Sequence, residues 1–275
     1  MTTATVRDTR HSSTLTDIAV ITKRNVLRVI RLPQLLVFST IQPVMFLLLF
    51  NYVFGGSIAR SPQIAAYGDY INWLIPGIML QTVTFGASQT AVGLTEDLGA
   101  GVIDRFRSLP MARSAVLAGR TISDLLRNVF VLTLLMSVGA LIGFRYQTSL
   151  SRTVFAVLLS VGFAFAFSWV MASIGLAVKD TETAQTASFL PLFPLVFASS
   201  VFVPLDTLPG WLRVFADYQP VTVLVNASRG LMLGEGALPE GATLGGTIAL
   251  SLVYIFGILA IFVPLSVRLY RRAAE

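Results

Sequence analysis

The chain has 275 residues, of which 55% are hydrophobic and only 12% are charged, and its formal charge is +6. A soluble domain carries roughly 25% charged residues, so this composition cannot supply the polar surface that a soluble protein of this length needs. Cysteine is absent, which excludes disulfide bonds, thiol nucleophiles and thiolate metal sites. Basic residues are not clustered with aromatic ones, so the positive charge does not indicate nucleic-acid binding.

Six stretches contain no Asp, Glu, Lys or Arg: 32–59, 70–95, 128–144, 153–178, 183–205 and 241–267. A bilayer core needs roughly 20 helical residues, which five of the stretches provide. The 17-residue stretch 128–144 reaches this length if the helix-compatible residues 114–127 precede it. We predict an all-α, polytopic membrane protein with six transmembrane helices, near 35–54, 71–93, 115–143, 153–178, 184–203 and 243–267.

The distribution of Lys and Arg predicts the orientation. With the N-terminus inside, fifteen Lys and Arg residues lie on the cytoplasmic side and five lie outside, as the positive-inside rule requires. Both termini are then cytoplasmic. We expect one permease domain over 1–275, with a cytoplasmic N-terminus at 1–34, a six-span bundle at 35–267 and a cytoplasmic tail at 268–275.

Residues 15–33, just before the first span, form an amphipathic pattern. At 100° per residue the apolar side chains gather on one third of the circle, and Arg24, Arg28 and Arg31 fall opposite them. This pattern predicts an interface helix in the inner leaflet with its basic face toward anionic headgroups. Whether the helix also docks a protein is left open by the residues.

Catalytic and energy-coupling motifs are missing. The single histidine is His11, and neither of the two lysines, Lys23 and Lys179, lies in a glycine-rich phosphate loop. No charged residue is predicted in the middle of a span, where proton relays usually need one. The chain is therefore not expected to be an enzyme or a proton-driven pump, while sodium coupling through carbonyls and hydroxyls is left open. A transporter with neither a motor nor a coupling carboxylate in its membrane part needs an energy source on a partner.

Neutral polar and aromatic residues occur on one face of the second span. These are Gln81, Phe85, Ser88 and Gln89, at spacings of three and four. They can join helices by hydrogen bonds or line a path for an amphipathic solute, and the sequence leaves both interpretations open.

The densest polar segment of the interior follows, at residues 95–113. Thr95 can cap a short cytoplasmic helix that extends to Ser108 and is stopped by Pro110. Such a helix, held between two spans, could dock a motor protein, and the alternative is a solvated loop. The candidate residues of this segment are Glu96, Asp97, Gly101, Asp104, Arg105, Phe106, Arg107, Leu109 and Pro110.

Roughly forty residues separate the fifth and sixth spans. They are too apolar for a free loop and too interrupted to span, so we predict short helices that dip partway into the membrane from outside. The candidate residues of this outer re-entrant region are Pro204, Pro209, Trp211 and Pro220.

Two segments resemble the ABC type-2 permeases, in particular the drug-resistance permeases of actinobacteria. They are EDLGAGVIDRFRSLPMARSAVLAGR at 96–120 and VFVPLDTLPGWLRVFADYQPVTVLVNASRG at 201–230. The resemblance implies a permease of the bacterial inner (plasma) membrane that pairs with itself and with two ATP-binding cassette subunits. It also implies that ATP and Mg²⁺ bind to those subunits, with no cofactor or metal on this chain, and that the interface helix and residues 96–110 contact the ATPase.

Three hypotheses follow. In the first, the chain exports hydrophobic or amphipathic compounds, such as antibiotics or lipids, and a separate ATPase provides the energy. In the second it is a channel or facilitator that needs no ATPase. In the third it is a membrane scaffold without transport activity.

Overall fold

The computed structural model describes residues 14–31, 33–58, 62–101, 113–178 and 180–273, and all regular structure within these ranges is helical. In chain order the elements are α1 (Thr14–Arg31), α2 (Pro33–Leu49), the π-helix η1 (Phe50–Phe54), α3 (Gly55–Ile58), α4 (Pro62–Ala65), α5 (Tyr70–Gly99), α7 (Arg113–Leu141), α8 (Leu150–Ala177), α9 (Thr181–Phe197), the 3-10 helix η2 (Leu205–Thr207), α10 (Gly210–Tyr218), α11 (Pro220–Leu233), the 3-10 helix η3 (Glu235–Ala237) and α12 (Leu244–Ala273).

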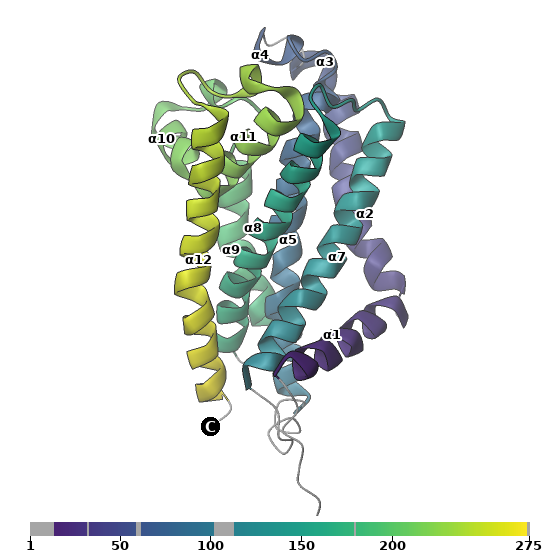
Figure 1. The fold of residues 1–275 in the computed structure, drawn as a ribbon, viewed down its shortest axis with the longest axis vertical. Coiled ribbons are helices and arrows are strands. Elements are labelled where there is room, and N and C mark those ends of the chain that lie inside the picture. The colour runs from purple at the N-terminus through teal and green to yellow at the C-terminus, as the bar shows by residue number, and fades with distance from the viewer. Residues whose placement is uncertain (1–13, 32, 59–61, 102–112, 179, 274–275) are drawn as a thin grey trace, which may run out of the picture.

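The long helices form a bundle. Figure 1 shows α2, α5, α7, α8, α9 and α12 running along the long axis of the molecule. Helix α1 lies across one end, where the C-terminus also lies, and α3, α4, α10 and α11 lie at the opposite end (Figure 1). We call these the α1 end and the α10 end.

Three helices in the described ranges are long and apolar enough to cross a membrane. They cover Leu117–Leu141, Leu150–Ala177 and Leu244–Arg272, and a shorter apolar helix covers Ser39–Phe54. Helix α7 is continuous from Arg113 over 29 residues. This confirms the prediction that the short charge-free stretch 128–144 is extended by the residues before Arg127.

Helix α5 lies at the centre of the bundle and packs against α2, α7, α8, α9 and α11. It has 30 residues and is buried on nearly all sides, including polar residues such as Thr84 and Thr90. Glycine allows a close approach to α8, because a Cβ atom at Gly175 would overlap the backbone of Ala91. The centre of the bundle therefore contains buried polar side chains as well as apolar ones.

Two predicted boundaries differ from the structure. The second span was expected to end near residue 93, but α5 continues to Gly99. The fifth was expected to reach residue 203, but α9 ends at Phe197, and residues 198–203 form a turn. The start of α9 is fixed by Asp180, whose carboxylate accepts a hydrogen bond from the Thr183 backbone N–H at 2.8 Å. Hydrogen bonds from Thr183 lower the pKa of Asp180.

Candidate functional site

Helix α1 is docked on α7 at the α1 end. Its buried residues Asp17, Ile21 and Asn25 recur every four positions and so form one stripe. A Cβ atom at Gly119 of α7 would lie 2.7 Å from the Ile21 side chain, so only glycine permits this approach. Ser123 Oγ donates hydrogen bonds to the carbonyl oxygens of Gly119 at 2.6 Å and, across the helix contact, of Thr22 at 3.3 Å.

This docking brings together two of the predicted site segments. Arg28 Nη2 lies 3.2 Å from Glu96 Oε2, and Arg24 Nη2 lies 3.7 Å from Asp97 Oδ2. Arg31, the last residue of α1, is exposed. The basic face of the interface helix is therefore directed in part toward the acidic end of α5, which sequence periodicity alone does not show.

The prediction for the start of the coupling segment was wrong in one respect. Thr95 does not cap a new helix but lies inside α5, where its Oγ1 donates to the carbonyl oxygens of Ala91 and Gly175, both at 3.0 Å. Helix α5 ends before Gly101, whose φ of +65° is a left-handed conformation that favours glycine. The remaining candidates Asp104, Arg105, Phe106, Arg107, Leu109 and Pro110 lie outside the described residues.

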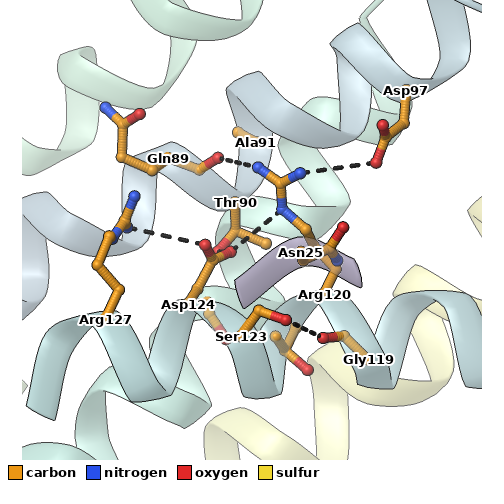
Figure 2. A network of polar contacts seen from close by, with 12 residues as sticks. Asn25, Gln89, Thr90, Ala91, Asp97, Gly119, Arg120, Ser123, Asp124 and Arg127 are labelled. Atoms are coloured by element: carbon orange, nitrogen blue, oxygen red, sulfur yellow. Dashed lines mark hydrogen bonds and ion pairs between the residues drawn. The ribbon is translucent and has the colours of Figure 1, made fainter. Parts of the chain in front are cut away.

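A buried cluster of charges lies beside this contact (Figure 2). Arg120 of α7 lies between two carboxylates, with its Nη1 at 3.6 Å from Asp97 Oδ2 and its Nε at 3.5 Å from Asp124 Oδ2. Asp124 also receives the Thr90 hydroxyl hydrogen bond at 2.6 Å, and its Oδ1 lies 3.8 Å from Arg127 Nη2. We call Thr90, Asp97, Arg120, Asp124 and Arg127 the charge cluster.

The charge cluster connects three helices. Asp97 is shared by Arg24 of α1 and Arg120 of α7, while Thr90 and Asp97 belong to α5. Space for the Arg120 guanidinium is left by Gly93, where a Cβ atom would overlap it. Because Asp97 and Asp124 are only 7% and 6% exposed, these ion pairs are shielded from water more than surface pairs are.

The four candidates for a substrate path line one pocket. Gln81, Phe85, Ser88 and Gln89 share it with further residues of α5 and with residues of α2, α7 and α9: Thr82, Gly86, Ser39, Gln42, Pro43, Arg127, Asn128, Val131 and Phe189. Its volume is about 80 Å³, well below the roughly 300–1,000 Å³ of a drug-sized site. The Gln81 Oε1 atom is buried there without a hydrogen-bond donor in the described structure.

A series of phenylalanine rings leads from this pocket toward the α10 end. Phe85 contacts Phe189 and Phe193 at centroid distances of 5.8 and 5.7 Å, and Phe193 stacks on Phe197 at 5.5 Å. The series continues through Phe202 to Phe50 and Phe54, at 5.4, 4.1 and 5.1 Å between successive centroids. We call these seven rings the phenylalanine ladder. Only Phe85 was predicted from the sequence, because the ladder joins rings of α5, α9, η1 and residue 202 that are far apart along the chain.

The outer candidates lie at the boundaries of short helices, as predicted for that region. Pro204 precedes η2, Pro209 precedes α10, and Pro220 is the first residue of α11. Trp211 is 77% exposed on α10. Helix α11, in contrast, is almost fully buried and packs against α5, α8 and α12.

A polar stripe along α11 and its N-cap residue Gln219 was not predicted from the sequence. Gln219 Nε2 donates to the Leu195 carbonyl oxygen at 3.0 Å, Thr222 Oγ1 accepts from the Ser200 backbone N–H at 3.3 Å, and Asn226 Oδ1 accepts from Ser200 Oγ at 3.1 Å. Arg229 completes the stripe. The spacing of three, four and three residues was the available signal, because it places all four on one helix face.

Arg229 was counted on the outer side, in the region predicted to form short re-entrant helices, and it lies inside α11 with an exposure of 2%. Its Nη2 donates to the carbonyl oxygens of Ser200 at 2.5 Å and Val201 at 3.2 Å, and its Nε donates to that of Trp73 at 3.1 Å. The guanidinium carbon lies 3.4 Å from the centre of the Trp73 ring. The prediction of short helices in this region did not extend to the burial of Arg229, because the apolar pattern of the stretch is interrupted.

Within the described ranges, no group of three or more His, Cys, Asp or Glu side chains is placed to hold a metal ion. The site offers neutral amides, hydroxyls and aromatic rings around a small pocket, with paired charges beside it. Such groups can bind and orient a solute through stacking and hydrogen bonds.

Known proteins resemble this chain over most of its length. Residues 16–233 match the ABC-2 type transporter family. A daunorubicin resistance ABC transporter permease of Streptomyces coeruleorubidus is 35% identical over 239 residues, which cover 87% of this chain and 80% of that protein. A Mycobacterium tuberculosis protein named as a probable doxorubicin resistance ABC transporter permease is 24% identical over 86% of this chain and 81% of its own length.

An inner membrane transport permease of Escherichia coli is 22% identical, covering 85% of this chain and 86% of the relative. The family match covers well over half of the chain, and the long apolar helices of the bundle suit a membrane. The chain therefore belongs to the ABC-2 type transporter family and is a membrane permease.

Proposed function

We propose that this chain is the membrane subunit of an ABC exporter that moves hydrophobic or amphipathic compounds out of the cell. The observation that carries the proposal is the pocket at Gln81, Phe85, Ser88 and Gln89, from which the phenylalanine ladder continues to the other end of the bundle. Amides and hydroxyls can orient the polar part of a solute, while stacked rings accept its apolar part.

The proposed membrane arrangement has six crossings, made by α2 with η1, α5, α7, α8, α9 and α12. In this arrangement the α1 end faces the cytoplasm, with both termini, and the α10 end faces outward. The excess of Lys and Arg in the segments on the α1 side supports this orientation. The exposed aromatic residue Trp211 on α10 suits the outer interface.

ABC-2 permeases work with ATP-binding subunits, and we propose that two such ATPases bind a homodimer of this chain at the α1 end. There, ion pairs connect α1 to the end of α5, directly before residues 102–112. A movement of either segment would reach α7 through Asp97 and Arg120. The assignment of Asp104 to Pro110 as ATPase contacts stays a sequence prediction.

The pocket volume of about 80 Å³ supports a site shared by two copies, since one chain then supplies only one wall. Large side chains of α2 and α9 are exposed, including Met45, Leu49 and the ladder rings Phe193 and Phe197, at 59%, 47%, 51% and 42%. A second copy placed against α2 and α9 would cover them and enlarge the enclosed volume.

Purification from native membranes through a tag on this chain tests the partner. The expected result is an ATP-binding cassette subunit in the purified complex. Its absence from gently solubilised material would argue for a facilitator or a scaffold.

Transport is tested with the complex in liposomes and daunorubicin as the probe, chosen because of the name of the Streptomyces relative. We expect ATP-dependent transport of daunorubicin, and we expect its rate to fall at least about tenfold in the variants Gln81→Leu and Phe85→Ala. Phe130→Ala is the control, because Phe130 is 48% exposed on α7 and does not line the pocket. Movement without ATP would favour a facilitator, and equal losses in all three variants would contradict the assigned path.

A further inference from the structure

The turn at residues 198–203 is fastened to the bundle through its backbone carbonyls. Arg229 donates hydrogen bonds to the carbonyl oxygens of Ser200 and Val201, and Tyr70 Oη donates one to the carbonyl oxygen of Phe202 at 2.7 Å. Three consecutive carbonyl groups thus receive hydrogen bonds from side chains of α11 and α5. We call these contacts the turn clasp.

The turn clasp is centred on the cation Arg229, which has no carboxylate against it among the residues that the structure describes. No Asp or Glu of the described chain forms an ion pair with Arg229, which is held by three carbonyl oxygens and the Trp73 ring. A buried guanidinium is tolerated only where hydrogen-bond acceptors surround it. Since two of its three acceptors belong to the turn, the environment of Arg229 depends on where the turn lies.

The turn lies flat on α5 at Gly77. A Cβ atom at Gly77 would overlap the Val201 carbonyl group, so no larger residue could occupy this position with the turn as it is. The Ser200 side chain donates a hydrogen bond to Asn226 of α11, and the Ser200 backbone N–H donates one to Thr222 of the same helix. Helices α5 and α11 therefore hold the turn from two sides.

This turn positions Phe202 in the phenylalanine ladder. Phe202 is 5% exposed and joins the rings of α9 to those of α2 and η1, with Phe197 on one side and Phe50 and Phe46 on the other. Beyond it, Phe54 and Tyr52 are 40% and 69% exposed. Phe202 thus lies where the ladder reaches the exposed α10 end.

We propose that Arg229 is a positioning residue that holds Phe202 across the outer end of the substrate path and so keeps the path closed until the turn moves. The identity of the path rests on the function proposed above, whereas the closure is a property of the turn clasp itself. When the turn lifts, water can replace the side-chain donors at the Ser200 and Val201 carbonyls. Without Arg229 these acceptors would be buried and unpaired in the closed state, which favours opening.

The experiment uses Ser199→Cys, the only thiol in a chain without cysteine. Ser199 is 1% exposed within the turn, so a membrane-impermeant maleimide added outside whole cells should react with it slowly. Arg229→Met keeps the length of the side chain but removes its donors, and we expect the labelling rate to rise by roughly tenfold or more. Arg229→Lys and Tyr70→Phe, which each retain part of the clasp, should give smaller increases.

Arg213→Met is the matched control, because Arg213 is a half-exposed arginine of α10 paired with Asp217; it should leave the labelling rate unchanged. Ser151→Cys, exposed at the start of α8, should be labelled equally in all backgrounds. If Arg229→Met does not give a monodisperse protein, Tyr70→Phe decides alone. Unchanged Ser199→Cys labelling in the folded variants overturns the proposal. Labelling that depends on Arg229 in a protein that transports nothing would support the closure and contradict the proposed function.

Discussion

At the α1 end, Arg120 and Arg127 lie against two carboxylates, whereas at the α10 end Arg229 lies against three backbone carbonyls and the Trp73 ring. In the charge cluster each carboxylate serves more than one arginine, so a shift of one helix can exchange one ion pair for another. In the turn clasp the acceptors are fixed to the main chain, and Arg229 keeps them only while the turn stays in place.

This difference suits the two ends to different tasks. Shared ion pairs among α1, α5 and α7 can stay satisfied through small movements, which is useful where force from an ATPase is expected to enter. A clasp on three consecutive carbonyls is either made or broken, which is useful for a closure. The predictions below test this contrast.

The largest expected effect is the loss of a carboxylate from the charge cluster. Asp124→Leu leaves Arg120 and Arg127 without their shared partner, and breaking one side of a buried pair costs about 3–5 kcal/mol. We expect a strongly lowered midpoint of thermal unfolding in detergent. The double variant Asp124→Leu with Arg120→Met removes one charge of each sign. Its unfolding midpoint should therefore fall less than that of Asp124→Leu alone. A double variant with strictly additive losses would show that the two residues are not coupled.

A smaller loss is expected at the turn clasp. Arg229→Met leaves the Ser200 and Val201 carbonyls without their donor, and each buried unsatisfied group costs about 1–3 kcal/mol. The same change removes a buried charge and with it the cost of burying that charge, which offsets part of the loss. Because no carboxylate is left unpaired, we expect a smaller fall in the unfolding midpoint than for Asp124→Leu. Intrinsic fluorescence offers a local readout in a Trp169→Phe, Trp211→Phe background, where the emission of Trp73 should change on loss of the cation. A larger fall in the unfolding midpoint than for Asp124→Leu would contradict the proposed difference between the charge cluster and the turn clasp.

The sequence predicts the long helices well because charge-free length is a strong signal in membrane proteins. The predicted end of α5 is too early. Glu96 and Asp97 look like the start of a loop in the sequence, because their partners Arg28 and Arg24 are some seventy residues away. The face formed by Gln81, Phe85, Ser88 and Gln89 is correct because helical spacing is local. Whether it is a substrate path stays a prediction.

The turn clasp could not be predicted in full. The stripe from Gln219 to Arg229 is visible in the sequence, but its acceptors are backbone atoms of residues 195–201 and of Trp73. Backbone carbonyls carry no sequence signature, so only the packing of α9, α11 and α5 shows that Arg229 is buried. A single arginine in an interrupted apolar stretch gives no sequence signal that its side chain is buried.

An intermediate effect on stability is expected when a substitution disrupts the contact between α1 and α7. Gly119→Val introduces side-chain atoms against Ile21, and overpacking of this kind costs about 1–3 kcal/mol. We expect α1 to detach before the bundle unfolds, so trypsin should cleave faster at the exposed Lys23. Gly257→Val is the control, because a Cβ atom there meets nothing within 4 Å. Equal cleavage of both variants would show that α1 is held mainly by its charges.

The smallest effect on stability is expected at the pair of Arg28 and Glu96. Both side chains are nearly half exposed at 47% and 43%, so water screens the pair, and it contributes about 0–1 kcal/mol. The charge swap Arg28→Glu with Glu96→Arg should therefore unfold at nearly the wild-type temperature, as should each single variant, with any difference vanishing at about 1 M salt. Transport by the reconstituted complex separates two roles of the pair. If α1 and α5 transmit motion through it, the single variants lose transport at normal stability and the swap restores it; if the pair is only a surface contact, all three variants transport like the wild type.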